Sequence, residues 1–241
     1  MDMIESDYTY VGSELELFAG ATRWKSYLAD QVAPFLGGEV LEVGAGLGGT
    51  TRRLCRGVER RWVCLEPDEG LAGRLSGAIV SGALPACCRV EVGTLERLAR
   101  EPAFDTLLYI DVMEHIEDDT GELARAGEFL RPGGHVVVLS PAHQWLYSPF
   151  DKAIGHYRRY TKSTLRALTP TGLDLVRLSY LDTVGLIASA GNRLFLRSAM
   201  PDPSQIAVWD RYMVRLSRVV DPLIRYSAGK SVLGVWRKPP R

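Results

Sequence analysis

The sequence lacks long apolar runs and has few cysteines. None of its 241 residues belongs to an uninterrupted apolar stretch near the roughly 20 residues that a membrane-spanning helix needs. The N-terminus is acidic and has no apolar signal core. Cysteine occurs at four positions without metal-site spacing, namely Cys55, Cys64, Cys87 and Cys88. These absences predict a cytoplasmic protein with free, buried thiols and no metal.

The sequence also has no excess of either charge, because 29 lysines and arginines balance 29 aspartates and glutamates. No overall electrostatic field therefore favours nucleic acid or an anionic membrane, and we expect a small molecule as the partner. Apolar residues make up 46% of the chain, which is enough for one sizeable core. We expect one large domain, residues 39–241, preceded by a helical segment, residues 1–38.

Apolar segments with strand character alternate with helix-like segments along the chain. The expected strands are residues 39–43, 61–66, 89–93, 104–111, 135–140, 173–181 and 231–237. The expected helices are residues 69–80, 94–100, 118–130 and 162–168. Strands separated by helices imply right-handed crossovers and a mostly parallel sheet. The predicted fold class is therefore α/β.

Two helical regions flank this alternation. The first is one helix from Ser13 to Val32, which opens with a capping box formed by Ser13 and Glu16. The second is an insertion, residues 183–230, before the last strand. One helix of the insertion, residues 204–226, has an apolar face made of Trp209, Met213, Leu216, Val220 and Leu223. Pro222 is expected to kink or split this helix.

Arginines occupy most of the opposite face of this helix. They are Arg211, Arg215, Arg218 and Arg225. Such a row fits a solvated surface. The alternatives are a cap over a site, a homodimer surface through residues 183–230, or a peripheral contact with lipid headgroups. The sequence leaves these alternatives open.

The segment Val40-Leu-Glu-Val-Gly-Ala-Gly-Leu-Gly-Gly49 predicts a buried strand, a tight turn and a helix start. Gly44, Gly46 and Gly49 fit the dinucleotide pattern Gly-x-Gly-x-x-Gly. Gly44, Gly46 and Gly48, with an acid at Glu42, fit the start of an S-adenosylmethionine (SAM) site. The glycines alone do not choose between the two cofactors.

Two acids narrow the choice of cofactor. Glu66 lies 22 residues after Gly44 at a strand end, where a carboxylate can bind both ribose hydroxyls of an adenine nucleoside. This acid argues against the 2′-phosphate of NADP. Glu42 lies inside an apolar strand, where a buried carboxylate needs a partner. In a SAM site that partner is the cationic end of the methionine, so Glu42 favours SAM.

Further motifs follow in a specific order. Leu-Glu-Pro-Asp occupies residues 65–68, Asp111-Val-Met-Glu-His115 follows the fourth strand, and Leu-Arg-Pro-Gly-Gly occupies residues 130–134. Across residues 39–141 the chain resembles the class I SAM-dependent methyltransferases, particularly small-molecule enzymes with an Asp-Val-(Leu/Met)-Glu-His signature. The resemblance implies a Rossmann-like sheet of seven strands with an antiparallel last strand. It also implies SAM as cofactor and S-adenosylhomocysteine as product.

The resemblance also implies cofactor contacts along the chain. The glycine turn passes beneath the methionine part, the acid after the second strand holds the ribose, and the turn after the third strand flanks the adenine. The loop after the fourth strand forms the floor under the sulfonium. The implied cofactor-binding residues are Glu42, Gly44, Ala45, Gly46, Leu47, Gly48, Glu66, Pro67, Gly93, Thr94, Leu95, Asp111, Val112 and His115. Many relatives have an acid where Thr94 stands, so the adenine contacts depart from the family pattern.

Residues 142–160 are rich in aromatic, histidine and arginine side chains, as a functional loop would be. They resemble a loop in bacterial methyltransferases with lipid- or natural-product-linked roles. His143 and His156 are the candidate catalytic bases, although each also fits a structural role. The loop arginines would clamp an anionic acceptor. The candidate substrate-binding residues are Tyr10, Phe18, Trp24, Trp145, Tyr147, Tyr157, Arg158, Arg159 and Tyr160, of which the first three belong to a lid formed by residues 1–38 or simply pack in its helix.

The sequence thus predicts a methyltransferase that moves the SAM methyl group to a small-molecule or lipid-linked acceptor, with oxygen favoured, by in-line displacement. An NAD-dependent oxidoreductase is the first alternative. It is weakened by Glu42, by Glu114-His115 and by the absence of a Tyr-x-x-x-Lys pair in the second half. A non-catalytic SAM-binding protein is the second alternative. An RNA methyltransferase is disfavoured by the neutral charge and by the absence of an Asn/Asp-Pro-Pro-aromatic motif.

Overall fold

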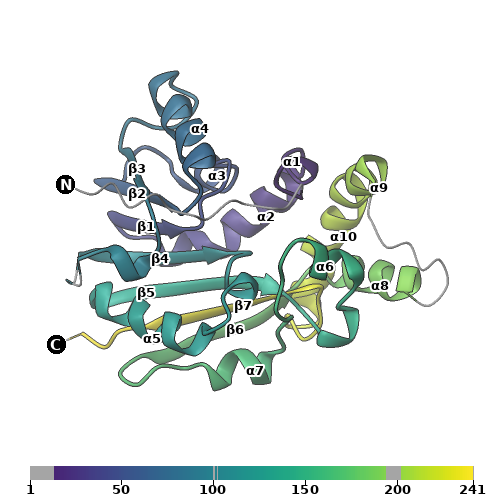
Figure 1. The fold of residues 1–241 in the computed structure, drawn as a ribbon. Coiled ribbons are helices and arrows are strands. Elements are labelled where there is room, and N and C mark those ends of the chain that lie inside the picture. Colours follow the sequence, from purple (N-terminus) through teal and green to yellow (C-terminus); the bar gives the residue numbers. More distant parts are fainter. Residues whose placement is uncertain (1–13, 100, 102, 194–201, 241) are drawn as a thin grey trace.

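The computed structural model describes residues 14–99, 101, 103–193 and 202–240, and it contains a seven-stranded sheet. The strands are β1 (Glu39–Val43), β2 (Arg61–Glu66), β3 (Cys88–Val92), β4 (Phe104–Ile110), β5 (Leu130–Pro141), β6 (Asp174–Leu181) and β7 (Ser231–Arg237). Their order across the sheet is β3-β2-β1-β4-β5-β7-β6 (Figure 1). Strands β1 to β5 pair in parallel, whereas β7 is antiparallel to both β5 and β6. The predicted fold class is confirmed.

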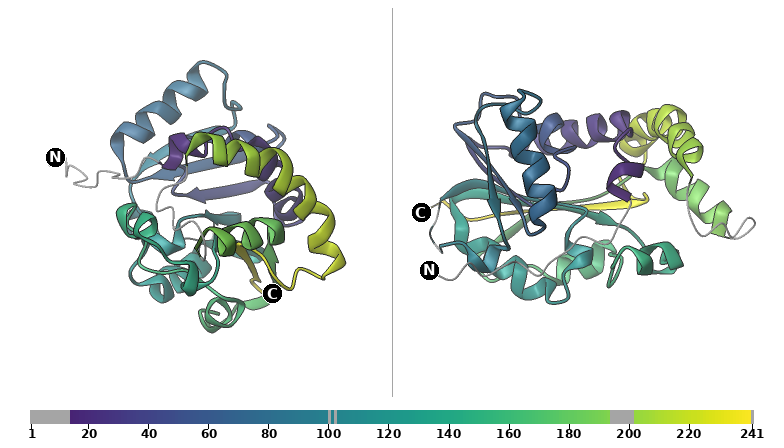
Figure 2. Two further views of the ribbon diagram at one scale, coloured as in Figure 1. Left: turned by 90° about the vertical axis from the view of Figure 1, so that its right-hand side faces the viewer. Right: turned by 45° about the horizontal axis from the view of Figure 1, so that its top comes forward.

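Helices cover both faces of the sheet (Figures 1 and 2). On one face pack α2 (Thr22–Val32), α3 (Thr51–Leu54), α4 (Glu69–Val80) and the helices of the C-terminal insertion. On the other face pack α5 (Asp119–Phe129) and α7 (Lys162–Ala167). Neighbouring residues of a strand therefore enter different cores, as Val40 and Leu41 do. This burial on both faces explains the continuous apolar runs of the central strands.

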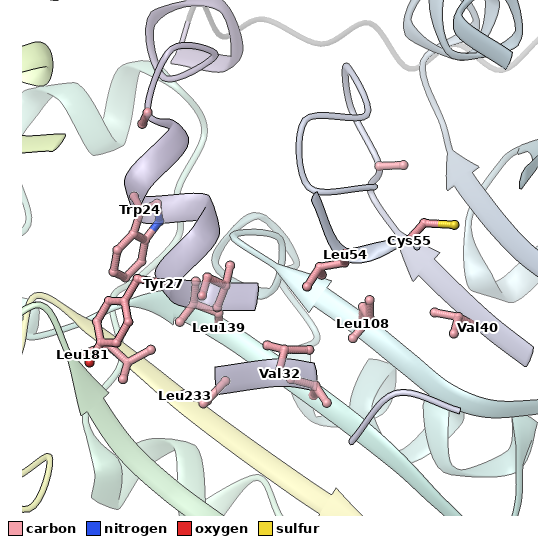
Figure 3. Packing of buried hydrophobic residues seen from close by; sticks show 14 of the residues in the cluster. Trp24, Tyr27, Val32, Val40, Leu54, Cys55, Leu108, Leu139, Leu181 and Leu233 are labelled. Atoms are coloured by element: carbon pink, nitrogen blue, oxygen red, sulfur yellow. The ribbon is translucent and has the colours of Figure 1, made fainter. Parts of the chain in front are cut away.

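The first of these cores joins α2 to the middle of the sheet. Figure 3 shows Trp24, Tyr27 and Val32 of α2 directed toward side chains of β4, β5, β6 and β7. Trp24 and Tyr27 also meet edge to face, with ring centroids 6.1 Å apart. The N-terminal helix is thus part of the main core, and it is fixed beside the carboxyl ends of the strands.

The single helix predicted for residues 13–32 is divided in two. Helix α1 (Glu14–Leu17) and α2 are separated around Gly20, and Ser13, with its predicted capping box, lies outside the described residues. The start of α2 is stabilised by Asp210, whose carboxylate accepts hydrogen bonds from the backbone N–H of Trp24 at 2.8 Å and of Arg23 at 3.2 Å. A side chain far along the chain therefore creates this helix start, which local patterns do not reveal.

The insertion forms a helical layer beside the sheet. It contains α8 (Thr183–Gly191), α9 (Pro203–Val208), a π-helical turn (Trp209–Met213) and α10 (Val214–Leu223), and the last three follow one another without a break. Pro222 does not split this helix, because it lies in the last turn of α10. The irregularity is the π-helical turn. The predicted apolar face is wrong in part, since Leu216 and Leu223 are exposed while Trp209 is buried.

The remaining differences are at element boundaries. The turn after β3 holds only a 3-10 turn, η2 (Leu95–Arg97), in place of the helix predicted to residue 100, and β5 begins at Leu130 instead of His135. The loop 142–160 contains η4 (Gln144–Leu146) and α6 (Pro149–Ala153), the latter opened by a capping box of Ser148 and Asp151. Across the described ranges, no helix is both long and apolar enough to cross a membrane.

Candidate active site

A cavity of about 1230 Å³ lies at the carboxyl ends of the parallel strands, where open α/β sheets bind ligands. It is lined by the glycine turn after β1, the loop after β4, the loop 142–160, helices α1 and α2, and helices α8 and α9. Figures 1 and 2 show these helices beside the ends of the strands. The cavity therefore joins the predicted cofactor turn, lid, acceptor loop and insertion.

The turn after β1 favours glycine at three positions. Gly44, Gly46 and Gly48 have φ angles of 67°, 56° and 69°, in the left-handed region. A Cβ atom at Gly44 would lie 2.7 Å from Val112 Cγ2, and one at Gly46 would lie 3.3 Å from the Leu15 side chain. Leu15 of α1 therefore covers the turn closely. Among the turn residues, Gly44, Ala45, Leu47 and Gly49 line the cavity.

Glu42 lies behind the turn, outside the cavity lining. Its carboxylate accepts hydrogen bonds from Thr51 Oγ1 at 2.7 Å and from Trp62 Nε1 at 2.8 Å. Burial raises the pKa of Glu42 to about 7, although the two hydrogen bonds act to lower it. The partner that the sequence required is thus supplied by the protein itself, and a contact between Glu42 and the methionine part of SAM stays a prediction.

Glu66, at the end of β2, ties this strand to the glycine turn. Its carboxylate accepts hydrogen bonds from the backbone N–H of Gly46 at 2.7 Å and of Asp68 at 3.1 Å. Burial raises the pKa of Glu66, against the effect of these two bonds. A carboxylate has about four acceptor positions, so two are left for other donors. Ribose binding by Glu66 therefore stays a prediction.

The loop after β4 forms an acidic part of the cavity wall. Asp111 faces the cavity with a φ angle of 55°. Loss of solvent around its carboxyl raises its pKa to about 6, although the charges of His156 and Lys230 act to lower it. Glu114 is fully buried, and neither carboxyl oxygen has a hydrogen-bond partner within the described part of the chain. Burial and the charge of Asp111 raise the pKa of Glu114 well above its usual range.

The loop 142–160 brings His156 to the same wall. His156 Nδ1 lies 3.0 Å from Asp151 Oδ1, and Asp151 also accepts two hydrogen bonds from Arg159, at 2.7 and 2.9 Å. Burial acts to raise the pKa of Asp151, but the hydrogen bonds from His156, Arg159 and Ser148 hold it well below its usual range. The bond to an ionised Asp151 makes Nδ1 the protonated nitrogen, which leaves Nε2 as an acceptor near the cavity.

His156 also completes a group with the donor types of a metal site. Glu114, His115 and His156 each offer an atom within 4.8 Å of the others, and His156 Nε2 lies 3.9 Å from Glu114 Oε1. Burial lowers the pKa of His115 to about 4, so its ring is neutral. Two imidazoles and a carboxylate suit a divalent cation.

A second group of this kind contains thiols. It is formed by Cys55, Cys87 and Cys88. All four cysteines of the chain are free, as predicted, and three of them are buried. Burial raises the pKa of Cys87 to about 11. Sequence spacing indicates neither group, because each is assembled by tertiary contacts.

The structure divides the predicted site residues into two sets. Those that line the cavity are Phe18, Trp24, Gly44, Ala45, Leu47, Asp111, His115, His156 and Arg159. Those that do not are Glu42, Gly46, Gly48, Glu66, Pro67, Gly93, Thr94, Leu95, Val112, His143, Trp145, Tyr147, Tyr157, Arg158 and Tyr160. Tyr10 lies outside the described residues.

Several residues of the second set hold the loop in place. His143 Nε2 lies 3.0 Å from the Gly229 carbonyl oxygen, and its ring stacks on Tyr180. Arg158 pairs with Asp119 at 2.6 Å, and the Tyr160 hydroxyl donates to the same carboxylate at 2.8 Å. These contacts fix the loop that carries His156. The structure therefore places His143 and His156 in different surroundings.

Among the cavity residues that sequence reasoning missed are Leu15, Glu114, Asp151 and Lys230. Glu114 had a signal, since its motif was recognised without a role for the side chain. Asp151 also had one, in the spacing from Ser148 that matches a capping box. Lys230 and Leu15 had none, because neither stands in a motif.

Sequence comparisons with known proteins find methyltransferases. Residues 41–136 match a family model described as a methyltransferase domain. Over 108 residues the chain is 27% identical to norajmaline N-methyltransferase from Rauvolfia serpentina, a match that covers 44% of this chain and 36% of the relative. The chain thus spans about a third of the length of that curated relative.

Solved structures share the fold at low identity. The [4+2]-cyclase SpnF superposes with a TM-score of 0.64 at 14% identity, covering 96% of both chains. Phosphoethanolamine N-methyltransferase 2 of Haemonchus contortus, in complex with SAM, superposes with a TM-score of 0.63 at 16% identity, covering 94% of this chain and 57% of the other. One neighbour is thus a cyclase, and the fold alone does not determine the reaction.

The ordered motifs, the sheet and the domain match agree with one another. Each lies at the cavity or frames it, from the glycine turn to the loop after β4. A dinucleotide site has no comparable support. Residues 41–136 match a methyltransferase domain, and together these findings support a SAM-dependent methyltransferase with SAM as its cofactor.

Proposed function

We propose that this protein transfers the methyl group of SAM to a hydroxyl oxygen of a small-molecule or lipid-linked acceptor held in the cavity. The observation that carries the proposal is the pair of His156 and Asp151. The His156 imidazole lines the same cavity as Gly44 and Asp111. A base and the glycine turn therefore share one cavity.

The residues of the cavity fit SAM, which supplies an electrophilic methyl group on a positively charged sulfur. Gly44 and Ala45 line the cavity with at most one methyl group, which leaves room for the methionine part. Asp111 would face the sulfonium, and the unpartnered carboxyl of Glu114 adds a second acid on this side. We assign the ribose to Glu66 and the adenine to the turn 93–95.

His156 would act as the general base for the acceptor. Asp151 holds the proton on Nδ1, so Nε2 can accept the hydroxyl proton as the oxygen bonds to the methyl carbon and the carbon–sulfur bond breaks. The products are the methylated acceptor, S-adenosylhomocysteine and a protonated His156. Asp151 stabilises that cation, because Arg159 and Ser148 keep it ionised and oriented.

The helices around the cavity would align the two substrates and exclude water. Leu15 and Phe18 of the proposed lid, residues 1–38, line the cavity together with α8 and α9 of the insertion, residues 183–230. Alignment of this kind lowers a barrier by roughly 7–11 kcal/mol at its most favourable. A transfer reaction that needs no covalent enzyme intermediate can depend mainly on this alignment of the substrates.

An anionic acceptor receives less support from the arginines that suggested it. Arg158 pairs with Asp119, and Arg159 pairs with Asp151. Neither guanidinium is therefore left to clamp a carboxylate or phosphate. This pairing favours an acceptor that reaches the site as a neutral hydroxyl, for which a base is useful.

Transfer to nitrogen is the second candidate, and a specific observation favours it. Asp111 lines the cavity and could bind an acceptor that carries a positive charge. Norajmaline and phosphoethanolamine methyltransferases are N-methyltransferases by name. Product analysis separates the two candidates, because a methyl ether and a methylamine differ in their fragmentation and exchange behaviour.

The test uses purified protein and SAM carrying a labelled methyl group. Calorimetry should detect binding of SAM and not of NADH, and a panel of hydroxyl and amine acceptors should yield a methylated product. His156→Asn should lower kcat by about 10²- to 10⁴-fold with little change in SAM affinity. His143→Asn is the comparison in the same loop. Because the His143 ring does not line the cavity, we expect a smaller loss of kcat than for His156→Asn.

Four results would count against parts of this proposal. Absence of SAM binding would remove the cofactor site, and SAM binding without methyl transfer to any acceptor would favour the non-catalytic alternative. Equal effects of the two histidine variants would remove His156 as the base. Loss of activity after dialysis against EDTA, with recovery on adding a divalent cation, would make His156 a metal ligand with Glu114 and His115.

A further inference from the structure

The helix formed by residues 203–223 has a second apolar stripe, which faces away from the protein. Five large apolar side chains on it are between 48% and 78% exposed. They follow one another at intervals of three or four residues, the spacing of one helical face: Val208, Tyr212, Leu216, Val219 and Leu223. Nothing among the described residues covers this stripe.

The other side of the same helix already has its partners. Ile206, Trp209 and Val214 pack into the core on the α2 side of the sheet. The Trp209 indole N–H also donates to Asp182 Oδ2 at 2.7 Å. The exposed stripe is therefore additional to what the fold needs, and an uncovered apolar face of this size usually marks a contact surface.

Charge along the helix is unevenly distributed. Arg211 and Arg215 are exposed beside the stripe, and no ion pair of either is found within the described part of the chain, while Arg218 pairs with Asp30. The acids of residues 203–223 are Asp210 and Asp221, and both are buried. The outward side is thus apolar and positively charged, although the whole chain has no net charge.

We propose that this outward side of residues 203–223 docks on an anionic lipid bilayer. The apolar stripe would enter the boundary between headgroups and acyl chains, and the arginines would lie at the level of the lipid phosphates. Arginine suits this position, because its guanidinium binds phosphate oxygens in pairs. The contact would be peripheral, and it is independent of which atom is methylated.

A second copy of the chain fits this surface less well. A two-fold axis would place the same stripe on both subunits and bring their arginines together, with no exposed acid on this helix to offset the repulsion. An anionic bilayer satisfies both the apolar stripe and the arginines.

The docked surface would lie next to the cavity. Helix α9 contributes Gln205 and Ile206 to the cavity wall, and α8 contributes Gly185 and Ala188. On α8, Ile187 is a further exposed apolar side chain, at 67%. Provided that the proposed methyl transfer holds, this position would suit an amphiphilic acceptor taken from the bilayer.

Vesicle co-sedimentation of the full chain tests the proposal. We expect the protein to bind vesicles of phosphatidylcholine mixed with phosphatidylglycerol, to bind pure phosphatidylcholine much less, and to be released by salt. Leu216→Ser with Leu223→Ser, and separately Arg211→Gln with Arg215→Gln, should each weaken binding by roughly tenfold or more. Val58→Ser with Val80→Ser is the matched control, because both valines are exposed outside this helix.

SAM affinity and molecular mass are measured on the same samples. Unchanged SAM binding in the variants would show that they fold, so a loss of vesicle binding would be local and distinct from a failure of the cofactor site. The proposal is overturned if the folded protein ignores anionic vesicles, or if the stripe variants bind them like the control. It is also overturned if the native chain is a dimer that the Leu216 and Leu223 variants dissociate.

Discussion

Glu42 and Glu114 are two buried carboxyl groups with different hydrogen-bonding environments. Glu42 accepts bonds from Thr51 and Trp62, whereas Glu114 has no partner among the residues described. Burial raises the pKa of both, and for Glu42 the value is about 7. Folding therefore favours the protonated form of each, and stability depends on pH through them.

The effect of Glu42 on stability has a definite sign. Its pKa rises from 4.5 in the unfolded chain to about 7 in the folded protein. The stability tied to this group is fully present below pH 4.5 and is lost as the pH rises through 7. Glu42→Gln cannot ionise. Its free energy of unfolding, relative to that of the native protein, should therefore rise by on the order of 2 kcal/mol from pH 5 to pH 8.

Urea unfolding of both proteins at the two pH values measures this gain. Glu91→Gln, at an exposed site on β3, is the control and should show no such difference. A gap between native protein and Glu42→Gln that does not change with pH would mean that Glu42 titrates alike in both states.

At the scale of elements, three buried aspartates hold the helices around the cavity. Asp210 accepts a hydrogen bond from the backbone N–H of Trp24 at the start of α2. Asp182 accepts hydrogen bonds from Trp209 Nε1 and Ser217 Oγ. Asp221 of α10 accepts from the Tyr27 hydroxyl at 2.8 Å and from the backbone N–H of Asp182 at 2.7 Å and of Thr183 at 3.0 Å. These bonds connect α2, α8 and α10, which no local pattern links.

Replacement of Asp221 should loosen this assembly. Asp221→Asn keeps the size but turns one acceptor atom into a donor, which then faces other donors. We expect a loss of about 2 kcal/mol or more in the free energy of unfolding, because a buried donor left without an acceptor costs about 1–3 kcal/mol. Asp202→Asn, at the exposed N-cap of α9, is the control and should cost little, since asparagine caps as well as aspartate. Equal losses in urea unfolding would contradict the anchoring role.

At the scale of the molecule, cofactor binding and folding should be coupled. The cavity is enclosed by segments from both ends of the chain, so SAM bound there would stabilise the folded state as a whole. At a concentration of SAM one hundred times its Kd, the expected stabilisation is about 2.7 kcal/mol.

Glu66→Gln offers a test of this coupling. Glutamine can still accept from the Gly46 N–H, so it disturbs the turn less than alanine, which would remove acceptors from two backbone donors. If the variant binds SAM about tenfold more weakly, the stabilisation at the same SAM concentration should fall to about 1.4 kcal/mol. Thermal and urea unfolding with and without SAM measure it. If SAM stabilises the variant as much as the native protein, Glu66 does not bind the ribose.

Much of the fold was predictable because its signals are local. The strand Glu39–Val43, the strand Arg61–Glu66 and the helix Glu69–Val80 were predicted with the bounds observed. Each combines an apolar run or a periodic pattern with a clear stop, such as Gly44 after the first strand or Asp68 as the cap of the helix. The pairing of the glycine turn with the loop after β4 also follows, since parallel strands end at one edge.

The sequence by itself therefore determined the sheet, the glycine turn and the resemblance to methyltransferases. Tertiary structure alone decided that Asp151 orients His156, that Asp210 starts α2, and which stripe of residues 203–223 faces inward. The physical reason is the same in each case. A helix with two apolar stripes, or a loop with several histidines, has alternatives of similar local energy, and only contacts with distant parts of the chain select one.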